Sequence, residues 1–285
     1  MNPLTEPSPV QFDPLPGICA VSYLNTVPLV WGMLRGRQRE QCRLHFCVPS
    51  ECADRVERGE DDLGIVPVIE VLRQGLLTVP GTGIACDGAV RSILLVSPKD
   101  PTGIRTLAAD TGSRTSVILC RILLRLVFGA DPEIIPTAPD LAGMLGQADA
   151  ALVIGDAALR LDPDALRGQV WDLGQLWREA TGLPMVFAVW AGKPERVRPL
   201  LNQGIAQWLE DSLQFGLHSI NTIIETESRR RAFSPDLTRR YLTRHIRFQI
   251  GERENLGLAR FVQHAGSLDA LLPSPQPVQT AMNPL

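Results

Sequence analysis

Short apolar runs alternate with amphipathic stretches along most of this chain of 285 residues. Each apolar run ends at a turn or a proline, and the next segment carries apolar residues at helical spacing. This alternation is typical of an α/β fold, in which helices flank a mainly parallel sheet. The strands expected from the pattern are 18–21, 44–48, 62–67, 78–85, 90–97, 106–109, 133–135, 150–154, 169–172 and 185–190.

The pattern becomes helical after Glu195. We expect one long amphipathic helix over 197–217, followed by helices over 221–231, 235–243 and 252–264. A run of three arginines at 229–231 resembles a nucleic-acid patch, but Glu225 and Glu227 stand four residues before two of them. Pairing along the helix explains these charges better.

The strands form two series, which predicts two lobes with a ligand cleft between them. A break at Pro98–Pro101 is the expected first crossing, and strand 185–190 carries the chain back. Clefts between hinged lobes favour small ligands. The expected division is a disordered leader 1–16, a discontinuous first lobe 17–98 and 190–272, a second lobe 99–189 and a flexible tail 273–285.

Charge and composition argue against some classes of binding partner. The net charge of −3 is too small to favour nucleic acid or a membrane surface. No stretch approaches the ~20 apolar residues of a membrane span. The leader lacks a basic start and an apolar run, so we expect no export signal, a cytoplasmic location and reduced cysteines. Its oligomeric state stays open.

A metal site is one reading of Cys42, His45 and Cys47, which stand in a C-x2-H-x-C arrangement. Strand alternation sends His45 and Cys47 to one face, and no second ligand pair follows at zinc spacing. We therefore expect no metal.

The clearest candidate for chemistry is the loop at 111–116, between a strand and an apolar helix. Ser113 is a good helix N-cap. The free N–H groups of the helix start, with the hydroxyls of Thr115 and Ser116, also suit a carboxylate or phosphate. Capping alone and anion binding both remain open from this spacing.

Further polar residues follow other strands. Ser22, Tyr23 and Asn25 come just after the first strand, where open α/β sheets bind ligands, although Asn25 also suits a helix cap. Weaker candidates are Arg91, Ser92, Gly155 and Asp156. No phosphate-binding loop, dinucleotide fingerprint, zinc-protease motif or nucleophile elbow is present.

In their order, these loops resemble one family, that of chorismate dehydratase and 1,4-dihydroxy-6-naphthoate synthase. The resemblance covers roughly 18–272, and the SYLN loop and the TGLPMVFAVW segment favour the dehydratase. The similar segments are VSYLNTVPL (21–29), DLGIVPVIE (62–70), DTGSRTSV (110–117), VIGDAAL (153–159), DLGQLWREATGLPMVFAVW (172–190) and YLTRHIRFQIGERENLGLARF (241–261).

The resemblance implies the fold of type 2 periplasmic binding proteins. It implies a lyase that converts chorismate to 3-[(1-carboxyvinyl)oxy]benzoate and water in the futalosine route to menaquinone, without cofactor or metal. Asn25 and Ser92 are then the expected catalytic residues. The expected substrate-binding residues are Ser22, Tyr23, Arg91, Ser113, Arg114, Thr115, Ser116, Gly155 and Asp156.

The reaction needs a base, and the candidate loops contain no histidine. Asp156 and Glu70 are the nearest acidic residues, and neither has an evident placement for the task. We expect the enolpyruvyl carboxylate of the substrate to take the proton while the protein holds it in position. A cytoplasmic sensor of small carboxylates and the naphthoate-forming enzyme remain the alternatives.

Overall fold

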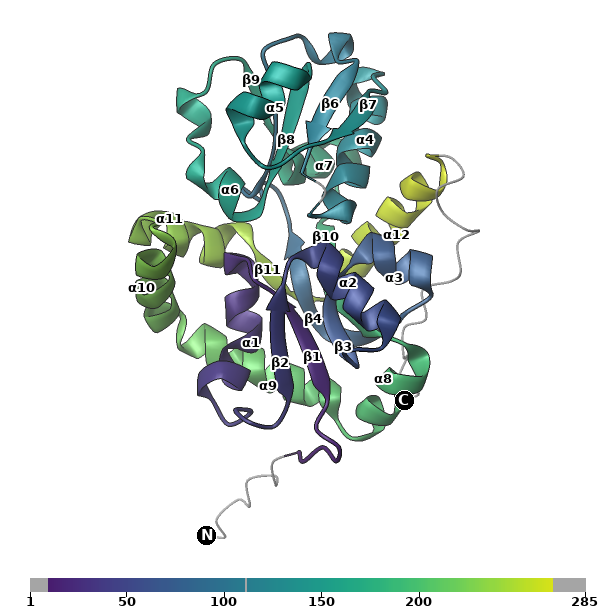
Figure 1. The fold of residues 1–285 in the computed structure, drawn as a ribbon, viewed down its shortest axis with the longest axis vertical. Coiled ribbons are helices and arrows are strands. Elements are labelled where there is room, and N and C mark those ends of the chain that lie inside the picture. Colours follow the sequence, from purple (N-terminus) through teal and green to yellow (C-terminus); the bar gives the residue numbers. More distant parts are fainter. Residues whose placement is uncertain (1–9, 111, 269–285) are drawn as a thin grey trace.

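The computed structural model describes residues 10–110 and 112–268, which form two α/β lobes joined by two crossings (Figure 1). Residues 1–9 of the expected leader, Thr111 and the expected tail 273–285 lie outside the described residues. Within the leader, Phe12 is only 5% exposed and packs edge-on against Trp208, with ring centroids 5.5 Å apart. The ordered first lobe therefore begins earlier than the expected residue 17.

The first lobe contains a six-stranded sheet in the order β11-β4-β10-β3-β1-β2. Strand β1 pairs in parallel with β2 and β3, whereas β10 and β11 pair antiparallel with their neighbours. Its strands are β1 (Gly17–Val21), β2 (Arg43–Cys47), β3 (Leu63–Pro67), β4 (Leu77–Cys86), β10 (Met185–Gly192) and β11 (Arg247–Ile250).

The second lobe contains a five-stranded sheet in the order β7-β6-β8-β5-β9. Strand β6 pairs in parallel with β7 and β8, and β5 runs antiparallel to β8 and β9. Its strands are β5 (Ile93–Ser97), β6 (Thr106–Ala109), β7 (Glu133–Pro136), β8 (Ala150–Ile154) and β9 (Gln169–Asp172).

Two details of the predicted organisation were wrong. Both sheets are mixed rather than mainly parallel. The first crossing precedes β5, because Ile93 pairs with Ile154 of the second sheet, and β10 belongs to the first sheet from Met185 onward. The apolar runs predicted where the strands lie. A strand buried on both faces has no sequence pattern that shows to which sheet it belongs.

The helices flank both sheets. The predicted helix over 197–217 is two helices, because Gly204 adopts φ +88 and breaks the run between them. In the first lobe they are α1 (Val27–Arg35), α2 (Pro49–Arg58), α3 (Val68–Gln74), α8 (Pro194–Asn202), α9 (Ile205–His218), α10 (Ile220–Arg231), α11 (Pro235–Arg240) and α12 (Glu252–Gly266). In the second they are α4 (Arg114–Phe128), α5 (Leu141–Gln147), α6 (Gly155–Arg160) and α7 (Leu173–Thr181).

One continuous set of buried apolar side chains runs through both lobes, and a smaller set lies on the other face of the second sheet. Helix α12 contributes to the junction: Phe261 packs against Trp177 of α7, with ring centroids 6.3 Å apart. Burial of such aromatic pairs stabilises the junction beyond their area alone. This contact holds α12 of the first lobe against α7 of the second.

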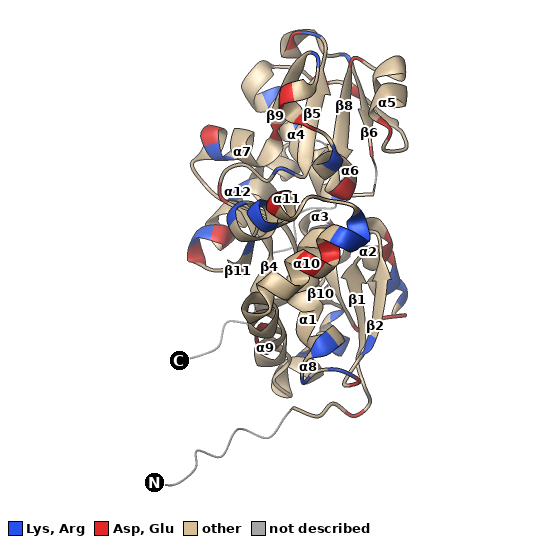
Figure 2. Cartoon of the chain, turned by 90° about the vertical axis from the view of Figure 1, so that its left-hand side faces the viewer, with Lys and Arg blue, Asp and Glu red and all other residues tan. Residues whose placement is uncertain are grey.

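Acidic and basic residues are interspersed along the chain in Figure 2, and residues of both signs occur where α6 approaches α10. Among the described residues, no helix is long and apolar enough to cross a membrane.

Candidate active site

A partly open pocket lies between the lobes, and its empty space, open solvent included, is about 480 Å³. Clefts between lobes are favoured places for small organic ligands. Residues of both lobes line this cavity, at the ends of β1, β3 and β8 and at the start of α4. The lining residues are Val21, Tyr23, Asn25, Pro49, Pro67, Ile84, Val90, Ser92, Ile93, Ser113, Ser116, Ile154, Gly155, Phe187 and Ala188.

Asn25 and Ser92 both line the cavity. Asn25 lies in a single 3₁₀ turn, η1 (Leu24–Thr26), directly after β1, and Ser92 directly precedes β5. Ser92 is only 2% exposed. Its Oγ accepts a hydrogen bond of 2.9 Å from the hydroxyl of Tyr241, so its own proton is left for a ligand.

Tyr241 was not among the predicted site residues. It opens a short π-helix, η4 (Tyr241–His245), and is 1% exposed. Burial raises its pKa well above the usual value, although hydrogen bonds with Ser92 and Asn25 oppose the shift. The phenol therefore keeps its proton and acts as a donor. Its only sequence signal is its place at the start of the segment 241–261.

The first turn of α4 presents two hydroxyls to the cavity. Ser113 occupies the N-cap position, but its side chain makes no capping bond. Its Oγ lies 2.9 Å from the Oγ of Ser116 instead, and both residues line the cavity. Capping alone therefore does not explain Ser113. One of the two hydroxyls donates to the other, so one hydroxyl proton and the N–H groups of the helix start are left for an anion.

The neighbours of these serines do not line the cavity. Thr115 accepts a hydrogen bond from the backbone N–H of Ile69, in the other lobe, at 3.3 Å. Arg114 pairs with Asp54 at 2.9 Å and with Glu70 at 3.2 Å, both across the junction. We expected both residues to bind substrate, whereas their side chains join the lobes.

Gly155 lines the cavity, whereas its neighbour Asp156 does not. Gly155 adopts φ +64, and a Cβ there would stand 2.9 Å from the ring of Tyr23, so this contact requires glycine. Asp156 accepts from the backbone N–H of Leu24 at 3.1 Å and pairs with Arg231 of α10. Gly155 lines the cavity, and Asp156 links the lobes.

Tyr23 extends from the first lobe onto Gly155. Burial, together with Asp110 and Asp156, raises the pKa of Tyr23 to about 12, so it stays protonated. Ser22 is exposed and outside the lining, and its backbone N–H donates to the carbonyl of Cys47 at 2.9 Å.

Arg91 was also expected to bind substrate, but it lies outside the lining. Its guanidinium donates to the backbone carbonyls of Ala158, at 3.0 Å, and Leu161. The backbone N–H groups of Val90 and Arg91 bind the carboxylate of Asp172 at 2.9 and 2.6 Å. These bonds fix the crossing that carries Ser92.

Among the described residues, the lining contains no carboxylate, imidazole, ammonium or guanidinium group. Both acidic candidates are engaged elsewhere, since Glu70 also pairs with Arg73 at 3.2 Å. The polar groups of the cavity are hydroxyls, one amide and the backbone at the start of α4. Such a lining can bind and polarise an anion, but it offers no ready proton acceptor.

Known proteins resemble the chain in sequence and fold. A family model described as menaquinone biosynthesis matches residues 16–267. A chorismate dehydratase from Thermus thermophilus is 30% identical over 261 residues, which cover 86% of this chain and 93% of that protein.

Solved structures share the fold at low identity. Protein AF1704 from Archaeoglobus fulgidus superposes with a TM-score of 0.68 at 13% identity, covering 88% of this chain and 97% of that one. The periplasmic aliphatic sulphonate binding protein SsuA from Escherichia coli gives 0.59 at 15% identity, with coverages of 87% and 89%. The predicted two-lobed fold of periplasmic binding proteins is thereby confirmed.

Proposed function

The chain belongs to the menaquinone biosynthesis family, and from this we propose that it is a chorismate dehydratase. This hydro-lyase removes water from chorismate and releases 3-[(1-carboxyvinyl)oxy]benzoate for menaquinone biosynthesis by the futalosine route. The single observation that carries the proposal, beside the family, is that Asn25, Ser92 and the first turn of α4 line one cavity between the lobes.

The reaction asks for stabilisation of negative charge. Chorismate loses the proton on the carbon that bears the enolpyruvyl ether, and the neighbouring hydroxyl then leaves. The carbanion is conjugated through the ring alkene to the ring carboxylate, where charge grows as an enediolate. Fixed donors aimed at that group act as an oxyanion hole, each worth ~2.7–4 kcal/mol where such donors have been removed.

The uncharged donors of the cavity support this chemistry. We assign Asn25 to the departing hydroxyl or the ring carboxylate. Ser92 holds a carboxylate from the first crossing, because the Tyr241 hydroxyl donates to its Oγ and turns the serine proton outward. Ser113 and Ser116 bind an anionic group at the start of α4, where the helix dipole adds ~0.3–1 kcal/mol.

The base in this proposal is the enolpyruvyl carboxylate of the substrate. The absence of an acceptor from the described lining supports it, as do the partners that occupy Asp156 and Glu70. A proton transfer within the bound substrate requires only that the protein hold the reacting atoms in line. Closure of the lobes orders both carboxylates and excludes water.

The test is to mix the purified protein with chorismate, without added cofactor, and to follow the products by chromatography and mass. A product lighter by one water that matches the enolpyruvyl benzoate is the expected result. Chorismate that binds and returns unchanged would support a carboxylate sensor instead. No binding would direct attention to the naphthoate-forming reaction.

A cytoplasmic location and chorismate as the only partner belong to the same proposal. All six cysteines are free thiols in the structure, which fits a reducing compartment.

A further inference from the structure

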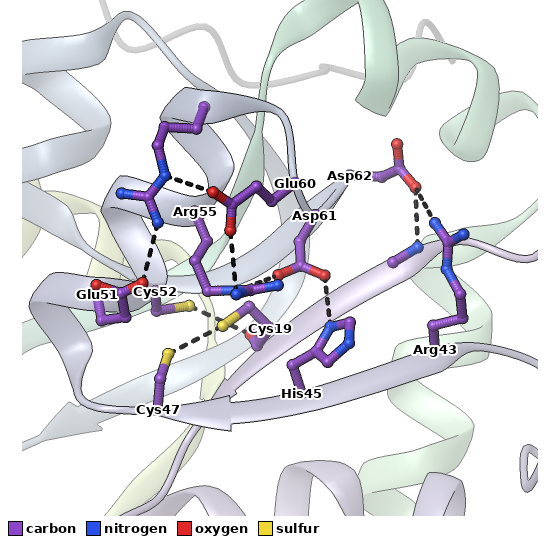
Figure 3. A network of polar contacts seen from close by, with 12 residues as sticks. Cys19, Arg43, His45, Cys47, Glu51, Cys52, Arg55, Glu60, Asp61 and Asp62 are labelled. Carbon is purple, nitrogen blue, oxygen red and sulfur yellow. Dashed lines mark hydrogen bonds and ion pairs between the residues drawn. The ribbon is translucent and has the colours of Figure 1, made fainter.

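Three cysteine thiols meet where α2 covers β1 and β2 (Figure 3). Cys19 comes from β1, Cys47 from the end of β2 and Cys52 from α2. Their sulfur atoms all lie within 4.8 Å of one another, and those of Cys19 and Cys47 are 3.0 Å apart. We call this group the thiol cluster.

Local structure explains why the three converge. In the parallel pairing of β1 and β2, Cys19 is opposite His45, so the side chains of Cys19, His45 and Cys47 share one face. Helix α2 covers that face and brings in Cys52, whose thiol donates to the carbonyl of Cys19 at 3.3 Å. Tertiary structure thus adds two thiols to Cys47 that its sequence neighbourhood did not supply.

The arrangement differs from the C-x2-H-x-C motif that we set aside. Cys42 is not part of the thiol cluster. His45 turns to Asp61, with Nδ1 and Oδ1 2.7 Å apart, and Arg55 pairs with the same carboxylate at 2.6 Å. The imidazole is therefore held by a neighbouring polar network, and the cluster consists of sulfur donors alone.

A pure sulfur donor set selects soft cations. Metal–sulfur bonds of about 2.3 Å separate three sulfur ligands by about 3.8–4.0 Å. The present spread brackets that spacing, and the contact between Cys19 and Cys47 must widen by about 1 Å. Cys19 and Cys52 are fully buried and Cys47 is half-buried, so the site is shielded but has an entrance.

Core packing and a disulfide are two simpler explanations of the thiol cluster, and each accounts for only part of it. Core packing accounts for one buried cysteine, since a thiol behaves as a small apolar group. A disulfide accounts for two sulfur atoms. Three thiols from three separate elements match the donor number of a metal centre.

We propose that Cys19, Cys47 and Cys52 bind one soft, thiophilic cation, Zn²⁺ or Cu(I), in a three-sulfur site that is separate from the cleft chemistry. The backbone links the site to the cleft. The carbonyl of Cys47 accepts from the N–H of Ser22, and Pro49 lines the cavity. The bound ion therefore stabilises the first lobe and the loop that carries Asn25.

The test uses the full chain, reduced with a phosphine and stripped of metal. Zn²⁺ is titrated in competition with a chromophoric chelator, and Cu(I) likewise without oxygen. We expect one ion to bind in at least one series, with a rise in melting temperature. Cys47→Ser and Cys52→Ala should each weaken binding by about 100-fold or more, as loss of one of three ligands implies.

Cys42→Ser is the matched control, because its thiol is nearby in sequence and lies outside the cluster. It should bind the ion as the parent does. The proposal is overturned if the protein does not compete with the chelator for either ion. It is equally overturned if Cys47→Ser and Cys52→Ala keep full affinity, or if mild peroxide forms a Cys19–Cys47 disulfide in a protein that binds neither ion. Chorismate is absent throughout, so the result does not depend on the proposed reaction.

Discussion

Residues that line the cleft and the charged residues next to them in sequence have different roles. We call the charged pairs of Arg114 and Asp156 across the junction the rim contacts. Ser92, Ser113 and Gly155 line the cavity, and each stands next to a charged residue that does not. Of those neighbours, Arg91 binds carbonyls, and the other two, Arg114 and Asp156, pair with the opposite lobe. The cavity is uncharged and mostly apolar, with a few hydroxyls and one amide, whereas Arg114 and Asp156 pair across the junction of the lobes.

This difference separates two kinds of effect. A neutral donor in the cavity acts on the reacting groups, so its loss lowers the rate. An ion pair at the rim acts on the equilibrium between open and closed lobes, so its loss weakens substrate binding. Kinetic constants distinguish the two, because rate and affinity respond separately.

The largest effect is expected in the lining. Asn25→Ala and Ser92→Ala should each lower kcat by about 10²–10³-fold, since each removes a donor from the developing charge. Substrate affinity, measured by calorimetry, should change much less. Ser22→Ala is the control, because Ser22 is exposed and outside the lining. An equal loss of rate and affinity would remove the transition-state role of either residue.

The next effect is expected at the rim. Asp156→Asn removes a mostly buried pairing with Arg231 that links the lobes, worth ~2 kcal/mol after discounting for its partial exposure. KM should rise by about 30-fold while kcat stays within a few fold. Asp164→Asn, at an exposed position, should change neither.

Asp156→Asn, together with Glu70→Gln, also tests the identity of the base. If Asp156→Asn or Glu70→Gln abolished turnover and left chorismate binding intact, a protein carboxylate would be the base. The substrate-assisted route would then be wrong.

A smaller effect is expected from the buried phenol. Tyr241→Phe removes the hydroxyl that bonds Ser92 and Asn25, with ~0.5–1.5 kcal/mol expected for each bond, and should lower kcat by about 10-fold. The loss in the double variant with Ser92→Ala should be less than additive, because part of the effect of Tyr241 passes through Ser92. Additive losses would show an independent role for Tyr241.

The smallest effect is expected from Arg114→Gln. This guanidinium is about one-third exposed, so its pairs across the junction contribute ~0.5–1 kcal/mol and weaken in salt. KM should rise about 2–5-fold, and the parent KM should drift upward with ionic strength. Arg121→Gln is matched, since Arg121 pairs with Asp131 within one lobe, and it should leave KM unchanged.

The sequence by itself determined the α/β class, most of the strands and helices, and most of the loops that surround the cleft. Strand β11 (Arg247–Ile250) was not among the expected strands. Apolar runs locate strands because burial on both faces demands them, and polar residues just after a strand indicate the edge where ligands bind. Asn25, Ser92, Ser113 and Ser116 followed from that logic together with the family resemblance.

Tertiary structure alone decided which of two adjacent residues faces the cavity, which sheet β5 joins, and that Tyr241 and the thiol cluster exist. Each depends on partners distant in sequence: Asp54 for Arg114, Arg231 for Asp156 and Ser92 for Tyr241. A local pattern records the environment that a residue needs, buried or exposed, apolar or polar. It does not record which distant group supplies that environment, because only the folded chain brings the two together.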